Sequence, residues 1–352
     1  RRTQGEDGMA DGRTAALRSG RVIDAHSHMV PASAIGPAER GELWHGIRFS
    51  RSPRGKIVSS AKGLSMEIPW PTPFETVPMR LAAMDDRRVD VHVVSISPTM
   101  YWYNLDPADA RSYAQATNDD LAQAVAAAPD RLAALAYLPF PDVAGAVAEL
   151  ERAVTRLGFA GAMVGSHVDG TDWDDPSLWP VLEAAESLGA ALYVHPARVR
   201  AGGMLPRFHF SNTIGNPLET TIALGSLIFG GAFDRFPRLR TCFAHGGGFA
   251  VIDGGRFDRA HAVRPEARRL ERRPSEYLRL CWFDCITHGE RALRYLIDEV
   301  GADRVVLGSD HPADMGEPRP VDFIESCATL SEAERDLILR RNAAAFLTGR
   351  TG

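Results

Sequence analysis

Short apolar, β-branched stretches alternate with longer amphipathic stretches along most of this chain. The apolar stretches have the length and composition of buried strands, and the amphipathic stretches repeat with helical spacing. The predicted strands cover residues 22–28, 89–97, 132–140, 159–168, 191–195, 239–245, 277–284 and 304–310. The predicted helices cover residues 79–88, 109–128, 143–157, 178–188, 218–229, 291–300 and 331–347.

This alternation favours one fold class. Strands that are apolar along their whole length are typical of a parallel sheet covered by helices. Eight such units in a chain of 352 residues predict an α/β fold of the (β/α)8 TIM-barrel type. An open, doubly wound sheet is the alternative, but no G-x-G-x-x-G motif follows the first strand.

The stretch after the first strand, residues 31–78, breaks the alternation. It is rich in Gly, Pro, Ser and Arg, and little periodicity is visible in it. Because connections this long are uncommon without a role, we expect an inserted lid or cap on a single barrel domain over residues 21–350. We expect residues 1–20, which lack an apolar segment, to be disordered rather than a signal peptide.

Composition and charge exclude several classes of protein. The chain is 45% hydrophobic and carries a net charge of −5, so it offers no basic surface for nucleic acid. No run of eighteen apolar residues is present, and no membrane span is expected. The four cysteines form no C-x-x-C pair, and we interpret them as reduced core residues of a cytoplasmic protein.

Histidines gather where the predicted strands end. The first strand ends in His26-Ser27-His28, and in a regular strand both imidazoles point to one face, about 6.6 Å apart. Further titratable side chains at strand ends are His167, His195, His245, Asp284, Asp310 and His311. A single histidine is more often structural, and H-x-H alone is a weak signal. Because strand carboxyl ends meet at one face of a barrel, the whole set predicts a metal site.

The motifs at these positions resemble a known family. They are IDAHSHMVP at 23–31, TNDDLA at 117–122, VGSHV at 164–168, ETTIALGSLIFGGAFDRFPRLRTCFAHGGG at 219–248, VVLGSDHPADMGE at 305–317 and NAAAFL at 342–347. Together they are similar to the amidohydrolase superfamily, in the branch that contains α-amino-β-carboxymuconate-ε-semialdehyde decarboxylase. The resemblance covers residues 22–349.

The resemblance implies a barrel that holds one divalent metal ion, zinc in the first place, with manganese as an alternative. Carried over by position, the metal ligands are His26, His28, His195 and Asp310. His245 is then the acid/base residue, and Asp310 also takes part in catalysis. Three nitrogens and a carboxylate suit zinc and leave room for a substrate.

A single metal ion is expected for a further reason. Two-metal members of the superfamily usually bridge their ions with a carboxylated lysine at the end of the fourth strand. The only lysines of this chain are Lys56 and Lys62, and the fourth predicted strand ends near Ser166 and His167.

The resemblance also implies contacts to a small carboxylate substrate. Arg256 follows His245 at the offset where relatives place an arginine that reaches the substrate of the neighbouring subunit, so a homodimer is expected. The alternative is a surface arginine paired with Asp253 or Asp258. His167 and Asp284 are further candidates, and each has a structural alternative.

Such a site suits two reactions. One is the metal-dependent, non-oxidative decarboxylation of a small unsaturated or aromatic carboxylic acid. The other is the hydrolysis of an amide, lactone or ester, and the ligands alone do not separate the two. The aromatic stretch Tyr101-Trp102-Tyr103 is expected either to stack on an aromatic substrate or to cover the core, whereas His92 and His311 are expected to be structural.

Overall fold

The computed structural model describes residues 16–68 and 75–350. Eight parallel strands pair in chain order and form the predicted (β/α)8 barrel. They are β1 (Ile23–Met29), β6 (Val91–Ile96), β7 (Leu132–Ala136), β8 (Gly161–Gly165), β9 (Ala191–His195), β10 (Arg240–Phe243), β11 (Trp282–Asp284) and β12 (Val305–Val306). Backbone hydrogen bonds from Ala25 N to Leu307 O and from His28 N to His311 O join the first strand to the segment after the last one.

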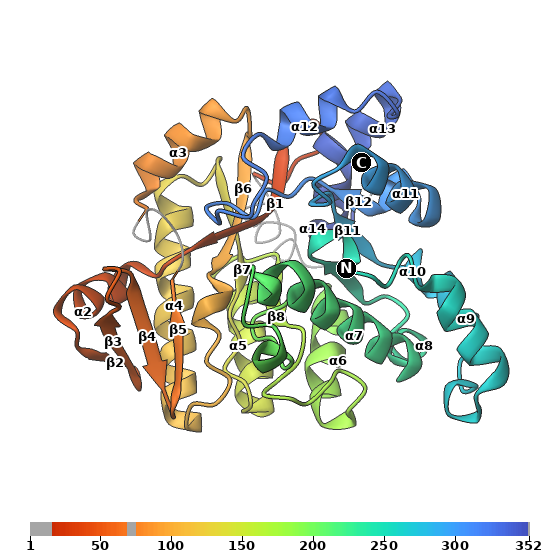
Figure 1. The fold of residues 1–352 in the computed structure, drawn as a ribbon. Coiled ribbons are helices and arrows are strands. Elements are labelled where there is room, and N and C mark those ends of the chain that lie inside the picture. Colours follow the sequence, from red (N-terminus) through yellow and green to blue (C-terminus); the bar gives the residue numbers. More distant parts are fainter. Residues whose placement is uncertain (1–15, 69–74, 351–352) are drawn as a thin grey trace, which may run out of the picture.

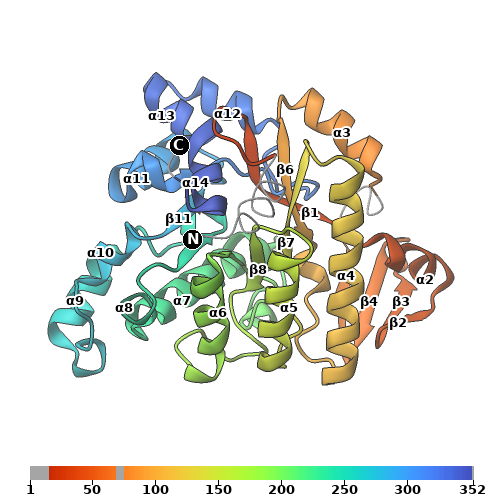
Figure 2. The same cartoon turned by 180° about the vertical axis from the view of Figure 1, so that it is seen from behind.

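Helices cover the outside of the barrel, as Figures 1 and 2 show from opposite sides. Those between the strands are α3 (Val77–Asp86), α4 (Pro107–Ala127), α5 (Val143–Thr155), α6 (Trp179–Leu188), α7 (Asn216–Phe229), α8 (Ala232–Arg235), α9 (Gly254–Val263), α10 (Pro274–Leu278) and α11 (Glu290–Val300). The chain ends in α12 (Pro320–Ser326), α13 (Glu332–Asp336) and α14 (Asn342–Thr348). Within the described parts of the chain, no helix has the length and apolar character needed to cross a membrane.

Side chains fill the barrel, so it is a packed core and not a pore. The interior cluster consists of Ile23, Ala25, Val91, Val93, Ala133, Leu135, Met163, Ala191, Tyr193, Cys242, Ala244 and Val306, with α14 side chains such as Phe346 below them. Of the expected disordered segment 1–20, residues 1–15 lie outside the described residues. Ala16 and Leu17 are buried in this same cluster.

The insertion after β1 is not the aperiodic stretch expected from the sequence. It contains α2 (Ile35–Arg40) and an antiparallel sheet of β2 (Leu43–Trp44), β3 (Ile47–Arg51), β4 (Ile57–Ala61) and β5 (Leu64–Glu67). The sheet lies beside α4 in both views (Figures 1 and 2), where the ring of Trp44 packs 5.2 Å from that of Tyr113. Residues 69–74 of this segment lie outside the described residues, and a role as a lid stays a prediction.

Several predicted strand limits change. The seventh strand begins at Trp282 and not at residue 277, because Pro274 opens α10 and the Glu276 carboxylate accepts a hydrogen bond from Arg273 N (3.0 Å). The eighth strand, β12, is shorter than expected. The chain beyond it continues alongside β1, to which it is joined by backbone hydrogen bonds. In β1 itself, the pairing register with β6 shifts between Asp24 and Ser27. Such a bulge re-aims side chains near a strand end.

Candidate metal centre

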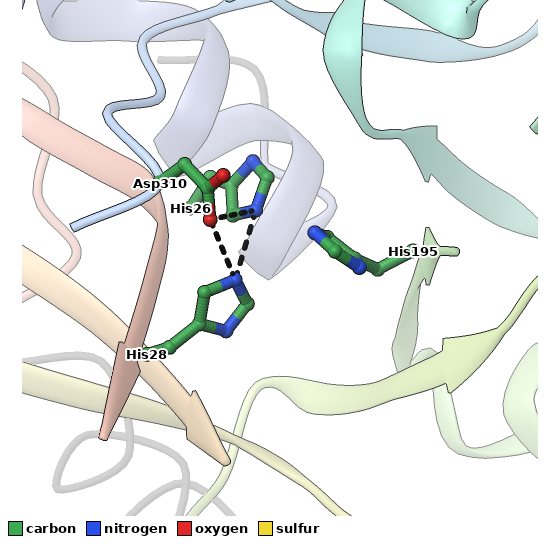
Figure 3. Close-up of side chains that lie close together, drawn as sticks. All are labelled: His26, His28, His195 and Asp310. Atoms are coloured by element: carbon green, nitrogen blue, oxygen red, sulfur yellow. Dashed lines mark hydrogen bonds and ion pairs between the residues drawn. The ribbon is translucent and has the colours of Figure 1, made fainter. Parts of the chain in front are cut away.

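Three histidines and one aspartate converge at the carboxyl ends of the strands (Figure 3). His26 and His28 come from β1, His195 ends β9, and Asp310 follows β12. Their ligand atoms, one from each residue, all lie within 4.8 Å of one another. The two Nε2 atoms of β1 are 3.1 Å apart, and Asp310 Oδ1 lies 3.0 Å from His28 Nε2 and 3.4 Å from His26 Nε2. The structure therefore brings together the four residues predicted as ligands.

The outer nitrogen of each histidine is held by the protein. His26 Nδ1 lies 2.7 Å from the Asp284 carboxylate, and His195 Nδ1 lies 2.8 Å from the carbonyl oxygen of Pro196. These acceptors place the ring proton on Nδ1 and leave Nε2 as the electron-pair donor that faces the centre. His28 Nδ1 lies 2.9 Å from the hydroxyl of Ser95.

A divalent cation fits this donor set. His195 Nε2 is buried and has no hydrogen-bond partner among the described residues. A buried nitrogen of this kind is costly unless something binds it. Three imidazoles and one carboxylate match the ligands that zinc and related ions take in catalytic sites. All four of these residues are buried.

The electrostatics of the four residues also suit a cation. Burial lowers the pKa of His28 to about 4 and holds the pKa of His195 well below its ordinary value, so both rings are neutral at pH 7. Burial alone would lower the pKa of His26 too, but the carboxylates of Asp310 and Asp284 outweigh it and raise this pKa to about 10. In the absence of metal, His26 therefore holds a proton that a cation displaces.

His245 sits beside the cluster without belonging to it. Its Nε2 is 3.7 Å from Asp310 Oδ2, and its ring centre is 5.0 Å from that of His195. The backbone of His245 is left-handed (φ 56°) and leads into three glycines, also with positive φ. A Cβ on Gly248 would stand 2.2 Å from the carbonyl oxygen of Pro217, so this turn needs glycine to approach α7.

A cavity of about 590 Å³ opens from His245 and Asp310. Much of its wall is apolar, from Phe249, Val251, Ile252, Ile286, Leu296 and Met315. Polar groups on the wall include Asn212, Asn216 and His288. None of the described residues that line it is an arginine or a lysine. This volume suits a small ligand whose body is largely apolar.

Asp284, one of the three predicted substrate contacts, lies behind the ligands and not in the cavity wall. Its buried carboxylate accepts hydrogen bonds from the Tyr193 hydroxyl (2.9 Å) and from the backbone N–H groups of His245 (3.0 Å) and Gly246 (2.9 Å). Together with its bond to His26, these contacts make Asp284 an orienting group.

His167 is likewise occupied by the protein. Its Nδ1 accepts a hydrogen bond from Gly170 N (3.0 Å), and its Nε2 donates to the carbonyl oxygen of Arg198 (3.0 Å). It lines a separate, small cavity next to Tyr101 and Trp102. The geometry therefore favours the structural alternative for His167. Tyr101 and Trp102 are not in the wall of the large cavity either.

Arg256 lies on α9, exposed to solvent and away from the cavity wall of its own chain. Among the described residues, Arg256 forms neither suggested ion pair, with Asp253 or with Asp258, and the Asp258 carboxylate accepts instead from Ser275 N (2.9 Å) and Ser275 Oγ (2.7 Å).

Sequence reasoning missed Ser95 and Tyr193, which hold His28 and Asp284, and most of the apolar wall. Tyr193 lies two residues before His195 in β9, so strand alternation offered a signal for it. The wall residues lie in loops and helices that no local pattern connects.

A (β/α)8 barrel with three histidines and an aspartate around one point at its mouth defines the class of metal-dependent barrel enzymes. The family model for amidohydrolases matches residues 23–348. The chain belongs to the amidohydrolase family.

Relatives agree with this placement. The 2-amino-3-carboxymuconate-6-semialdehyde decarboxylase of Dictyostelium discoideum is 35% identical over 329 residues, which is 92% of this chain and 91% of that protein. The crystal structure of 5-carboxyvanillate decarboxylase from Sphingomonas paucimobilis is 26% identical, with a TM-score of 0.76, and covers 94% of this chain and 99% of its own. A dihydroxybenzoic acid decarboxylase from Polaromonas sp. JS666, solved with manganese, shares the fold at 22% identity and a TM-score of 0.76, over 94% and 97% of the two chains.

Proposed function

We propose that this protein is a metal-dependent, non-oxidative decarboxylase of a small unsaturated or aromatic carboxylic acid. The observation that carries the proposal is the position of His245, at the junction of the ligand cluster and the apolar cavity. The relatives reported above are decarboxylases by name, which favours this reaction over the hydrolysis of an amide, lactone or ester.

The reaction requires a proton at a defined place. The bond between the carboxylate carbon and the neighbouring carbon breaks, its electron pair stays on the neighbouring carbon, carbon dioxide leaves, and that carbon takes a proton. A bound cation would supply positive charge that holds the carboxylate and draws electrons towards it. Protonated His245 is placed to donate the proton from Nε2, and Asp310, 3.7 Å away, stabilises the charged ring before the transfer. The apolar wall of the cavity lines the space next to His245 in which this carbon would lie.

The test is release of carbon dioxide by the metal-loaded protein from a panel of small unsaturated and aromatic carboxylic acids. The panel includes mono- and dicarboxylates, and amides, lactones and esters of the same acids run in parallel. We expect carbon dioxide and the protonated product from at least one acid. Hydrolysis of the derivatives without any release of carbon dioxide would contradict the proposal and restore the hydrolase alternative.

Zinc is the metal that we propose, with manganese as the alternative, because both accept imidazole and carboxylate ligands. Elemental analysis of protein purified without chelator decides between them. We expect one equivalent per chain, since the described residues contain a single cluster of potential ligands and β8 ends without a lysine.

We also propose that the active unit is a homodimer in which Arg256 reaches the substrate of the neighbouring subunit. Figure 1 shows α9 projecting away from the barrel. Close to it in sequence, Phe249 and Ile252 are 38% and 68% exposed, and the segment before α7 exposes Met204 and Phe208 (83% and 74%). Phe249 and Ile252 also line the cavity, so a second copy that covers them would lie at the cavity mouth. A guanidinium there would grip a carboxylate through two hydrogen bonds.

Mixing two inactive variants tests the arrangement in trans. His245→Ala and Arg256→Ala are combined under conditions that exchange subunits, and a mixed dimer then has one site with both residues intact. We expect activity to return. No return of activity, in mixtures shown to exchange, would place Arg256 in its own site or outside any site.

The cytoplasm is the proposed location, because all four cysteines are buried as free thiols.

A further inference from the structure

Beneath α3, behind the metal ligands, lies a second cluster of charged side chains that the proposed reaction does not use. Arg80 is completely buried, with an exposed fraction of 0%. Glu75 lies 2.8 Å from it. Burial alone would raise the pKa of Glu75, but the hydrogen bond with His311 and the charge of Arg80 outweigh it and lower this pKa, so the carboxylate is charged. A buried, charged guanidinium is rare unless it is paired and hydrogen-bonded.

Arg80 contacts two barrel strands. Its Nη2 donates to the carbonyl oxygen of His28, the second ligand of β1. Its Nη1 donates to His92 Nδ1 in β6, at 3.1 Å. Since a guanidinium has only donors, His92 carries its proton on Nε2, which faces the Asp24 carboxylate at 3.4 Å. The helix α3 is thus fixed to the strand that supplies two ligands.

Glu75 extends the cluster to the segment that supplies the carboxylate ligand, Asp310. Its Oε1 lies 2.8 Å from Nε2 of His311, the residue after Asp310. His311 Nδ1 accepts a hydrogen bond from Arg87 Nη1 at 2.7 Å, so Nε2 bears the proton and donates a hydrogen bond to Glu75. His311 is therefore held in one tautomer and one orientation, next to a ligand whose own backbone is left-handed (φ 59°).

We propose that Arg80 and Glu75 are positioning residues of the metal centre, which fix His28 and Asp310 relative to one another across the seam where the barrel closes. The ligand atoms of these two residues are 3.0 Å apart, and they belong to the two ends of the chain. One directed ion pair spans both segments, from the His28 carbonyl through Arg80 and Glu75 to His311.

Charge, rather than bulk, is what this role needs. Apolar side chains of the same volume often stabilise a fold as well as a buried ion pair does, but they give no directed contact to a carbonyl oxygen or an imidazole. Groups that orient metal ligands usually lower metal affinity about 10–100-fold when they are replaced. The role of Arg80 and Glu75 concerns metal binding alone, so its test does not depend on the reaction proposed above.

The test compares Glu75→Met/Arg80→Met, which removes both charges and keeps the volume, with the parent protein. The dissociation constant for zinc is measured by competition with a chelator, the absorption spectrum is recorded with cobalt in place of zinc, and urea unfolding is followed without metal. We expect zinc affinity to fall about 10–100-fold and the cobalt spectrum to change.

Glu149→Gln is the matched control. Glu149 is also buried, at 4% exposure, and accepts from Asn118 (2.6 Å) and Arg152 (2.8 Å) on the outside of the barrel. It should alter unfolding and leave zinc affinity and the cobalt spectrum unchanged. A folded double variant with the parent's zinc affinity would overturn the proposal.

If the double variant fails to fold, Glu75→Gln replaces it. That substitution keeps an oxygen acceptor for His311 and removes only the charge that faces Arg80. We expect zinc affinity to fall in this variant too, and an unchanged affinity would refute the role of the pair.

Discussion

His245 illustrates how one residue is set apart from its neighbours. Three histidines around it have an outer nitrogen fixed by the protein, whereas His245 Nδ1 has no hydrogen-bond partner among the described residues. Its backbone N–H donates to Asp284, which also holds His26. The backbone of His245 is therefore tied to the ligand cluster, while no described protein group holds its ring at Nδ1.

We expect His245→Ala to lose turnover and keep metal. The loss should be about 10²–10⁴-fold, the usual contribution of a positioned acid or base. Turnover and metal content are measured on the same preparation. If metal is lost together with turnover, His245 is a ligand and the assignment of roles has to change.

His167 leads to a prediction about acid stability. Burial lowers its pKa, and protonation would break the hydrogen bond that its Nδ1 accepts from Gly170 N. Because the unfolded chain then binds more protons, the stability contributed by neutral His167 is present above about pH 6.5 and is lost as the pH falls.

In His167→Asn, the side-chain oxygen can still accept from Gly170 and does not titrate. We therefore expect urea unfolding of this variant to depend less on pH between about 5.5 and 7.5 than that of the parent. Turnover should change little, in contrast to His245→Ala. A large rise in KM would return His167 to the substrate contacts.

At the scale of elements, the barrel was readable from the sequence because buried parallel strands are apolar along their length. The four ligands were readable because strand ends share one face of a barrel. The insertion was missed, although β4 and β5 are joined by Lys62-Gly63, both with positive φ (50° and 80°), as a two-residue hairpin turn requires. The weak alternation of these short strands hid that signal.

Other elements depend on contacts that no local pattern contains. The start of β11 was displaced because a proline and a glutamate favour the short helix α10. The places of Asp284 and His167 follow from hydrogen bonds to residues far along the chain. The sequence pattern predicts that both residues lie at strand ends. Which groups they contact depends on tertiary structure.

The glycine turn after β10 gives a prediction for an element. Gly248→Ala should push the turn away from α7, because the added Cβ would meet Pro217 O. A shift of about 1 Å in the position of His245 can cost on the order of 10²-fold in rate. Gly203→Ala, where the added Cβ meets nothing within 4 Å, is the control and should keep full turnover. Equal turnover of both variants would show that the turn is not strained.

For the whole molecule, the four proposed metal ligands come from the first and fifth strands of the barrel and from the segment after the last strand. A cation that binds all of them stabilises only the folded chain. At a free concentration of 1,000 times its Kd, it adds about 4 kcal/mol to the free energy of unfolding. We expect a chelator to lower the midpoint of thermal unfolding, and zinc to restore it.

Thermal unfolding with and without added zinc also distinguishes metal ligands from residues that only lie beside the metal. His195→Ala should unfold at a temperature that zinc hardly changes, whereas His245→Ala should respond as the parent does. A full response of His195→Ala to zinc would remove it from the ligand set.

The seam of the barrel has a consequence for how the protein is made. His26 and His28 leave the ribosome long before Asp310 and the segment that pairs with β1 are synthesised. Domains fold as units during synthesis, so a nascent chain that stops before Asp310 holds at most the three imidazoles and no complete binding site. We therefore expect tight binding of metal only after the segment that contains Asp310 has closed the barrel.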